Sequence, residues 1–336
     1  MRKIRIAQIG INRNSHGKEI FETLKKYPDV FDIAGYALVE NERENCEKKL
    51  FVFEGYKELT LEEILNDPTI EAVTVETDEV DLTKYALMAA EHGKHVHMEK
   101  PGSQSLEDFE RLIDTVKAGG KVFHIGYMYR YNPYVIELIE KVRAGELGEI
   151  YSVEAQMNCR HKPHTREWLC SFKGGMMFFL GCHLVDLVML IQGVPSNVIA
   201  LNKSTGMDGV KTEDYGMAVL EYPNGTSFVK TCAAEIGGFV RRQLVVSGTK
   251  GTVELKPLEI LIRESKYLQY TDKTEYTDAD DWFTLGEGSR TELFDRYDDM
   301  LMAFAAMVRG EKANPYTADY ELELFKVLLK CCGADK

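Results

Sequence analysis

Apolar residues in the first 125 positions fall into short runs that alternate with longer amphipathic segments. Short apolar runs predict buried strands, and apolar residues that recur every three or four positions predict helices. The predicted strands are 2–9, 31–39, 72–76, 95–98 and 122–125, and the predicted helices are one that begins near Ile20, then 61–66, 82–92 and 105–118. Because strands that alternate with helices form parallel sheets, residues 1–125 are expected to form one doubly wound α/β domain.

Residues 126–336 show a different pattern, in which alternating strands follow one another with few helices between them. A helix is predicted for 133–144, and turn sequences such as Pro223-Asn224-Gly225 separate the strands beyond it. Those strands are predicted at 150–157, 198–202, 215–222, 226–233, 241–247, 251–255 and 259–263, with amphipathic helices at 292–308 and 319–332 that pack back on the domains. A second, α+β domain with a large, mostly antiparallel open sheet is therefore expected.

A polar turn with the sequence Gly10-Ile11-Asn12-Arg13-Asn14-Ser15-His16-Gly17 joins the first predicted strand to the first helix. Such a turn can bring backbone N–H groups and a helix N-terminus onto a pyrophosphate. It departs from the Gly-x-Gly-x-x-Gly pattern at Asn12, although asparagine tolerates positive φ, and Asn14 or Ser15 could cap the helix. An ordinary strand-to-helix connection is the alternative. The candidate cofactor-binding residues here are Gly10, Asn12, Arg13 and Asn14.

The second predicted strand ends at Glu40. A carboxylate at that point can accept hydrogen bonds from the adenosine ribose hydroxyls and repels a 2′-phosphate, which favours NAD over NADP. Arg43 lies three residues on and could instead turn toward a phosphate. Alternatively, Glu40 only begins the charged run through Lys49, which would then be a solvated helix face.

Glu99, Lys100 and Pro101 directly follow the predicted strand 95–98. Proline has no N–H to donate and biases the preceding residue toward an extended conformation. An amine would thus be held at the carboxyl end of a strand, which is where ligands bind in open α/β sheets. The alternative is a surface Glu–Lys pair before a loop proline.

The net charge of −13 argues against a nucleic-acid groove, because the basic excess that neutralises phosphates is missing. The chain has neither a helix-length apolar run nor the apolar segment of a signal peptide after Met1-Arg2-Lys3, so we expect a cytoplasmic protein with no membrane partner. The seven cysteines are scattered without a Cys-x-x-Cys spacing, which predicts reduced thiols.

Further segments carry a resemblance to a known family: Gly93-Lys94-His95-Val96 before Glu99-Lys100-Pro101, Gly126…Arg130-Tyr131-Asn132-Pro133, Gly174-Gly175…Gly181-Cys182-His183-Leu184-Val185-Asp186, and Gly248-Thr249-Lys250-Gly251-Thr252. With these segments the chain resembles the Gfo/Idh/MocA family of NAD(P)-dependent oxidoreductases. The resemblance implies an N-terminal Rossmann domain, a C-terminal α/β domain with an open sheet, and hydride transfer to or from a sugar, polyol or related secondary alcohol. It also implies a homodimer or homotetramer that forms through sheet faces.

The resemblance assigns roles to particular residues. Lys100 matches the family lysine, which contacts substrate and nicotinamide and helps to move the hydroxyl proton, and His183 matches a histidine that is often the acid or base. Many members place an aspartate four residues before that histidine, whereas this chain has Phe179, so the triad is incomplete. Thr77 and Glu99 join the expected cofactor site, and the chain departs from the family at Asp78 and Leu82.

The segment from Met157 to Trp168 is dense in polar side chains and is expected to be a substrate-facing loop. Trp168 could stack on a sugar face, and Asp186 could orient His183 or be a structural carboxylate. Tyrosines at 127, 129 and 131 could line the pocket or belong to the core. The candidate substrate residues are Tyr129, Arg130, His161, His164, Arg166, Trp168, Phe179 and Asp186. His161-x-x-His164 fits no common zinc site well, so no metal is expected.

The leading hypothesis is an NAD-dependent dehydrogenase of a sugar, glycoside or cyclitol, with Lys100 and His183 as catalytic residues. One alternative is an enzyme that keeps its NAD bound and uses a redox cycle to cleave or epimerise glycosides. The other is a non-catalytic regulatory protein that binds NAD, an option that Phe179 leaves open.

Overall fold

The computed structural model describes residues 2–262, 267–278 and 282–334. The chain forms two compact units, one of residues 1–127 with 297–322 and one of residues 128–296 with 323–336. The expected division near residue 125 differs from this in one respect, since 297–322 returns to the first unit. The reason is visible in α9 (Asp298–Val308), whose buried Phe304 packs on the rings of His97 and His124.

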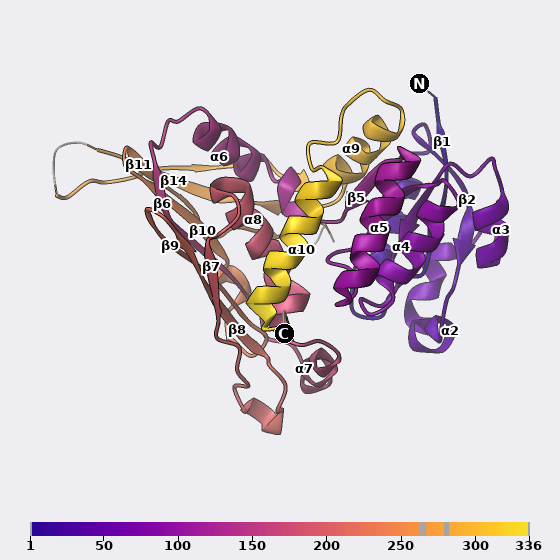
Figure 1. Cartoon of the computed structure of the whole chain (residues 1–336), viewed down its shortest axis with the longest axis horizontal. Coiled ribbons are helices and arrows are strands. Elements are labelled where there is room, and N and C mark those ends of the chain that lie inside the picture. Colours follow the sequence, from indigo (N-terminus) through magenta and orange to yellow (C-terminus); the bar gives the residue numbers. More distant parts are fainter. Residues whose placement is uncertain (1, 263–266, 279–281, 335–336) are drawn as a thin grey trace. The chain divides into compact units, whose positions relative to one another are not determined.

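The first unit is built on a five-stranded parallel sheet in the order β2-β1-β3-β4-β5. Its strands β1, β2 and β5 are labelled in Figure 1. The strands are β1 (Ile4–Ile9), β2 (Phe31–Ala37), β3 (Ala72–Val75), β4 (His95–Met98) and β5 (Phe123–Ile125). The helices are α1 (Gly17–Lys26), α2 (Glu42–Asn45), the 3₁₀ helix η1 (Glu47–Phe53), α3 (Leu61–Asn66), α4 (Leu82–Glu91), α5 (Leu106–Gly119) and α9. The sequence pattern predicted all five strands, and the doubly wound α/β assignment is confirmed.

Local capping explains where two of the predicted helices begin. Thr60 and Glu63 form a reciprocal capping box at the start of α3, and Ser105 accepts the N–H of Asp108 at the start of α5. Gly120 then ends α5 in the left-handed conformation, with φ of 60°.

The second unit contains an eight-stranded sheet in the order β15-β14-β11-β10-β6-β9-β8-β7 (Figure 1). Its strands are β6 (Ile150–Asn158), β7 (Asn197–Ala200), β8 (Tyr215–Tyr222), β9 (Gly225–Cys232), β10 (Gln243–Gly248), β11 (Gly251–Leu255), β14 (Asp272–Thr277) and β15 (Glu287–Arg290). All neighbours pair antiparallel except β6 and β9, so the expected mostly antiparallel sheet is confirmed.

The α-helices that lie wholly in this unit are α6 (Pro133–Arg143), α7 (Pro163–Trp168) and α8 (Cys182–Gln192). The unit also contains the π-helix η4 (Met177–Gly181) and the 3₁₀ helices η2 (Met128–Tyr131), η3 (Leu169–Ser171), η5 (Met207–Gly209) and η6 (Phe239–Arg241). Helix α8 packs on β6 and β9. The last helix, α10 (Ala318–Cys332), agrees with the predicted 319–332 and begins in the first unit.

Two predictions near residue 260 and residue 292 were wrong in part. The strand expected at 259–263 is only β12 (Ile260–Leu261), and Arg263 lies outside the described residues. The helix expected at 292–308 begins at Asp298, because Phe294–Asp295 forms the strand β16, which pairs with β13 (Leu268–Tyr270).

Strand β14 gave no hydrophobic signal because its partners on α6 are charged. Lys141 of α6 binds Glu275 at 2.6 Å, and Lys273 binds Glu137 at 2.6 Å. An ion-pair layer thus replaces the apolar contact that a sequence pattern detects. In the part of the chain that the structure describes, no helix is long and apolar enough to cross a membrane.

Candidate functional site

The turn between β1 and α1 is built around close backbone contacts. Gly10 has φ of 83°, and a Cβ there would lie 2.7 Å from Cγ2 of Thr77. A Cβ on Gly17 would lie 2.6 Å from the carbonyl oxygen of Ile11. A side chain at either position would clash with its neighbours, so both residues must be glycine, which explains why the last glycine of this turn falls at Gly17.

Asn12 takes the place of a glycine and organises the turn with its side chain. It is 1% exposed, has φ of 49° and donates from Nδ2 to the carbonyl oxygen of Thr77 at 2.7 Å. Its Oδ1 accepts the N–H groups of Asn14 at 2.7 Å and Ser15 at 3.2 Å. The suggestion that Asn14 or Ser15 caps α1 was wrong, because the N-cap position is His16, which makes no side-chain cap.

Two residues of the charged run after β2 also belong to this turn. Glu42 is 7% exposed and accepts the N–H groups of Ile11 at 3.0 Å and Asn12 at 3.1 Å. Lys49 donates from Nζ to the carbonyl oxygens of Asn12 at 2.8 Å and Ser15 at 2.9 Å. The alternative of a solvated helix face is therefore wrong for these two side chains. Burial raises the pKa of Glu42 and lowers that of Lys49.

Glu40 lies three residues beyond the end of β2, which stops at Ala37 instead of the predicted residue 39, and it has φ of 50° and an exposed side chain. It accepts hydrogen bonds from Nζ of Lys84 at 2.7 Å and the hydroxyl of Tyr85 at 2.6 Å, and these bonds hold its pKa below the usual range. Arg43 forms an ion pair with Glu58, so this guanidinium is already engaged by a carboxylate. Arg13 is exposed.

The turn fits a polar ligand such as a dinucleotide. The buried polar atoms beside it that have no hydrogen-bond partner among the described residues include Nδ2 of Asn14, Oδ1 of Asp78 and Oε1 of Glu79. Buried polar groups are normally paired, so such a group of unpaired atoms around a glycine turn indicates a place for hydroxyl, amide or phosphate groups. Gly10, Asn12, Asn14, Thr77 and Glu40 are the residues that would hold it.

Lys100 lies directly after β4, at the carboxyl end of the strand, and is 3% exposed. Its Nζ lies 3.6 Å from Oε1 of Glu99, which is also 3% exposed. The alternative of a surface Glu–Lys pair is wrong, because both side chains are buried. Burial raises the pKa of Glu99, while the Lys100 charge opposes that shift.

Glu79 gives the first unit a pH-dependent stability. Burial raises the pKa of this fully buried carboxyl to about 8, although the Lys100 charge opposes the shift. Because the folded-state pKa lies above the unfolded-state value, the stabilisation is complete below about pH 4.5 and is lost as pH rises through 8. Relative to a Glu79→Gln variant, the free energy of unfolding of the wild type should fall by a few kcal/mol, on the order of 2–4, between pH 5 and pH 8.

Urea denaturation of both proteins across this pH range measures the difference. The exposed Glu62 on α3 provides the matched control, since Glu62→Gln should run parallel to the wild type. Parallel curves for Glu79→Gln as well would show that Glu79 has an ordinary acidity.

In the second unit, His183 lies in the first turn of α8 and is 3% exposed. The ring of Tyr129 packs edge-on against it, with centroids 5.1 Å apart. Phe179 occupies the preceding π-helix η4 and contacts the rings of His161 and Trp168. Phe179 therefore contributes an apolar wall where a carboxylate was expected from the family pattern.

The structure changes the interpretation of two predicted substrate residues. Arg130 and Asp186 are each 1% exposed and form a two-point ion pair, from Nε to Oδ2 at 2.9 Å and from Nη2 to Oδ1 at 2.7 Å. A buried, paired guanidinium is a structural group, so this pair holds η2 against α8.

The predicted substrate loop at 157–168 is held in place by contacts with neighbouring segments. Arg166 is 1% exposed and binds Asp208, Asp214 and the carbonyl oxygen of Met207, so it ties α7 to the loop at 207–214. Trp168 packs edge-on against Phe172 and Phe179, at 5.1 Å in each case. His164 is exposed and His161 is half-buried, and burial lowers the pKa of His161. Arg166 is therefore a scaffold group, whereas Trp168, which is only partly buried, and the two histidines stay predictions for substrate contact.

The sequence did not predict the buried charge network around Glu259. Glu259 is fully buried and accepts hydrogen bonds from the hydroxyl of Tyr129 and from Arg242 and Arg296. Burial acts to raise its pKa, but Arg296 and Arg242 outweigh burial and lower it to about 2. No sequence signal links these residues, which lie in separate segments. Through Tyr129 this network positions the ring that packs on His183.

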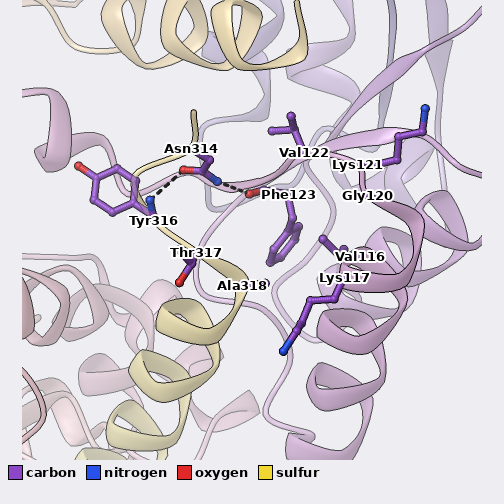
Figure 2. A pocket seen from close by; sticks show the side chains of 10 residues that line it. All are labelled: Val116, Lys117, Gly120, Lys121, Val122, Phe123, Asn314, Tyr316, Thr317 and Ala318. Carbon is purple, nitrogen blue, oxygen red and sulfur yellow. Dashed lines mark hydrogen bonds between the residues drawn. The ribbon is translucent and has the colours of Figure 1, made fainter. Parts of the chain in front are cut away.

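Among the described residues, no group of three histidine, cysteine, aspartate or glutamate side chains could hold a metal ion. A pocket of about 280 Å³ in the first unit lies between the end of α5, the start of β5 and the segment 314–318 (Figure 2). Asn314 donates to the carbonyl oxygen of Phe123 at 2.8 Å beside it. This pocket is at the amino end of β5, the edge opposite to the one that bears Lys100, and contains none of the predicted site residues.

Comparison with known proteins agrees with this architecture. A family model described as an oxidoreductase family with an NAD-binding Rossmann fold matches residues 4–127, and the GFO/IDH/MocA C-terminal domain matches residues 135–254. The chain is 26% identical to the uncharacterized oxidoreductase ORF334 of Rhizobium meliloti, over 80% of this chain and 78% of that protein.

Two further proteins have activities in their names. The chain is 28% identical to the scyllo-inositol 2-dehydrogenase (NADP⁺) IolW of Bacillus subtilis strain 168, over 48% of this chain and 46% of IolW. A solved levoglucosan dehydrogenase in complex with NADH and levoglucosan superposes with a TM-score of 0.77, covering 100% of this chain and 98% of that one. At 18% identity, this second likeness shows the fold.

Proposed function

The chain belongs to the Gfo/Idh/MocA family of oxidoreductases, and we propose from this that it transfers a hydride between NAD and a secondary alcohol of a sugar, glycoside or cyclitol. Support for this substrate class comes from the named relatives, which act on an inositol or were solved with levoglucosan.

The observation that carries the proposal is the place of Lys100. This buried amine lies at the carboxyl end of β4, in the same unit as the glycine turn, where an open α/β sheet binds its ligand. Burial disfavours the ammonium form of a lysine, and a cationic ring nearby disfavours it further. Lys100 can therefore accept the proton of a substrate hydroxyl while a bound nicotinamide, the hydride acceptor, takes the hydride. His183, buried against Tyr129, is our candidate for a second substrate contact.

The preference for NAD rests on the end of β2. Glu40 offers a carboxylate at the position expected to meet the adenosine ribose, and Glu42 lies within the same turn. Arg43, the nearest guanidinium in sequence, is held by Glu58. The carboxylates disfavour a 2′-phosphate by repulsion, and the guanidinium of Arg43, which is paired with Glu58, does little to offset that repulsion. The similar proteins include both an NADP-dependent enzyme and a structure with NADH, so the support for NAD comes from this chain's own residues.

Purified protein mixed with NAD or NADP and a panel of sugars, glycosides and cyclitols tests the proposal. We expect reduced cofactor to accumulate with NAD and at least one substrate of the panel, and less with NADP. Calorimetric titration with each cofactor supplies the binding constants independently of turnover.

The other outcomes contradict the proposal in distinct ways. Altered sugar without net NADH, detected by mass spectrometry, would indicate a redox cycle on a retained cofactor. Tight NAD binding with no chemistry on any compound would indicate a regulatory protein, and the absence of cofactor binding would contradict the site itself.

A further inference from the structure

A row of polar side chains crosses the interior of the parallel sheet in the first unit. Backbone pairing places Gln8, Thr74, His97 and His124 side by side on β1, β3, β4 and β5, and each is fully buried. Strands of a parallel sheet covered on both faces are normally apolar at such positions. Four adjacent polar residues therefore need a reason.

The turn between β1 and α1 explains why Gln8 and Thr74 are polar. Thr74 donates to Oε1 of Gln8 at 3.3 Å, and Nε2 of Gln8 donates to the carbonyl oxygens of Gly10 and Gly17, both at 2.9 Å. Gln8 and Thr74 thus hold the glycine turn in place.

The other half of the row consists of His97 and His124, and the carboxyl group of Glu76 lies beside His97. Nδ1 of His97 lies 2.7 Å from Nδ1 of His124, which is a hydrogen bond. Nε2 of His97 faces Oε1 of Glu76 at 3.8 Å. Both oxygens of Glu76 and Nε2 of His97 are buried without a hydrogen-bond partner in residues 2–262, 267–278 and 282–334. Glu76 follows β3 directly, so it lies between this row and the edge of the sheet that bears Lys100.

The short contact between the histidines restricts where protons can be. One Nδ1 must carry a hydrogen and the other must accept it. If His97 donates to His124, its Nε2 has no hydrogen, and Glu76 must be protonated to face it. If His124 donates, Nε2 of His97 carries a hydrogen toward a Glu76 carboxylate. The arrangement of hydrogens at one end of the group therefore determines the arrangement at the other end.

We propose that Glu76, His97 and His124 form a buried proton relay that responds to the charge on Lys100. This proposal rests on the function proposed above, and the three residues act through Lys100 as positioning residues. When Lys100 accepts the hydroxyl proton, the substrate O–H bond breaks and an N–H bond forms at Nζ, while the hydride passes from carbon to the nicotinamide. Glu76 then moves from the 3.8 Å of this structure to hydrogen-bond distance of Nε2 of His97, its O–H bond breaks, and an N–H bond forms at Nε2. The Nδ1–H bond of His97 breaks and one forms at Nδ1 of His124, which keeps its own Nε2–H and so becomes an imidazolium; the positive charge on His124 balances the negative charge left on Glu76.

The charges that face Glu76 support this coupling. Burial raises its pKa well above the ordinary value, and Glu99, Glu19 and Glu79 raise it further, whereas the Lys100 charge lowers it. Burial also lowers the pKa of His97 to about 3, so His97 is expected to stay neutral and to pass protons rather than keep one. An ammonium at Lys100 therefore favours an ionised Glu76, and that carboxylate stabilises the ammonium in return.

Nitrogen NMR of isotope-labelled histidine in the cofactor-free protein tests the relay without any turnover. In the wild type, the His97 and His124 signals should change with pH as Lys100 loses its charge. In Lys100→Met, whose relay residues are untouched, these signals should no longer change in that range. Identical histidine titrations in the two proteins would overturn the proposal, even if the protein proves to be an active dehydrogenase.

Kinetics supply the second test. Because the glutamine of Glu76→Gln cannot ionise, it cannot stabilise the ammonium form of Lys100. The variant should therefore lower kcat about tenfold and move the acid limb of the pH–rate profile for alcohol oxidation to lower pH. His97→Leu should do the same. His95→Gln on the same strand is the control, because His95 bonds the N–H of Val122 outside the row and should leave the profile unchanged. Wild-type profiles for both relay variants would also overturn the proposal, whereas a loss of the proposed function would show as no turnover in any protein.

Discussion

Replacement of Lys100 by methionine is expected to lower kcat/KM for alcohol oxidation by about two to four orders of magnitude, the usual contribution of a general base. Methionine keeps the length and apolar stem of the buried side chain but cannot accept a proton. Glu99, which lies 3.6 Å from Nζ, would lose its cation and favour its neutral form. Steady-state reduction of NAD in the wild type and the variant measures the effect.

The companion measurements separate chemistry from binding and folding. NAD affinity should change far less than kcat, because the turn around Gly10 and Asn12 is intact. Lys121→Met is the matched control, since Lys121 is exposed just before β5 at the opposite edge of the sheet. A Lys100→Met enzyme as active as the wild type would remove Lys100 from the mechanism.

Replacement of Glu259 by alanine is expected to destabilise the second unit by about 3–5 kcal/mol, since it leaves two buried guanidinium groups without their carboxylate. Arg242 and Arg296 both bind Glu259, and their side chains are only 7% and 9% exposed. The hydroxyl of Tyr129 would also lose its acceptor, so the ring that packs on His183 should become less ordered. Urea denaturation measures the loss, with Glu287→Ala on the exposed strand β15 as the control.

The pH dependence of this loss has a defined sign. The pKa of Glu259 is lowered to about 2, so its stabilisation is present above about pH 4.5 and disappears as pH falls toward 2. The difference between the wild type and Glu259→Ala should therefore shrink in acid. A loss below about 1 kcal/mol at neutral pH would mean that solvent or other groups already compensate the arginines.

In the turn after β1, the local sequence predicted some of the residues that build the turn but not the others. Gly10 and Asn12 were predicted from the strand–turn–helix sequence, and the structure supplies their positive φ values and the hydrogen bonds that hold them. Glu42 and Lys49 were not assigned to the turn, because they lie about thirty residues further along in a run that is charged throughout. Only the return of the chain past β2 brings these side chains to Ile11, Asn12 and Ser15.

The amino-acid sequence by itself determined the alternating strands and helices of the first unit, the strands β6 to β11 of the mostly antiparallel sheet, the family and the place of Lys100 at a strand end. These features follow from local periodicity and from motifs of a few adjacent residues. Tertiary structure alone decided that Arg130 binds Asp186, that Arg166 is scaffold, that 297–322 joins the first unit, and that His97 meets His124. The physical reason is that a buried charge must find its partner wherever the fold places it, and sequence separation carries no information about that distance.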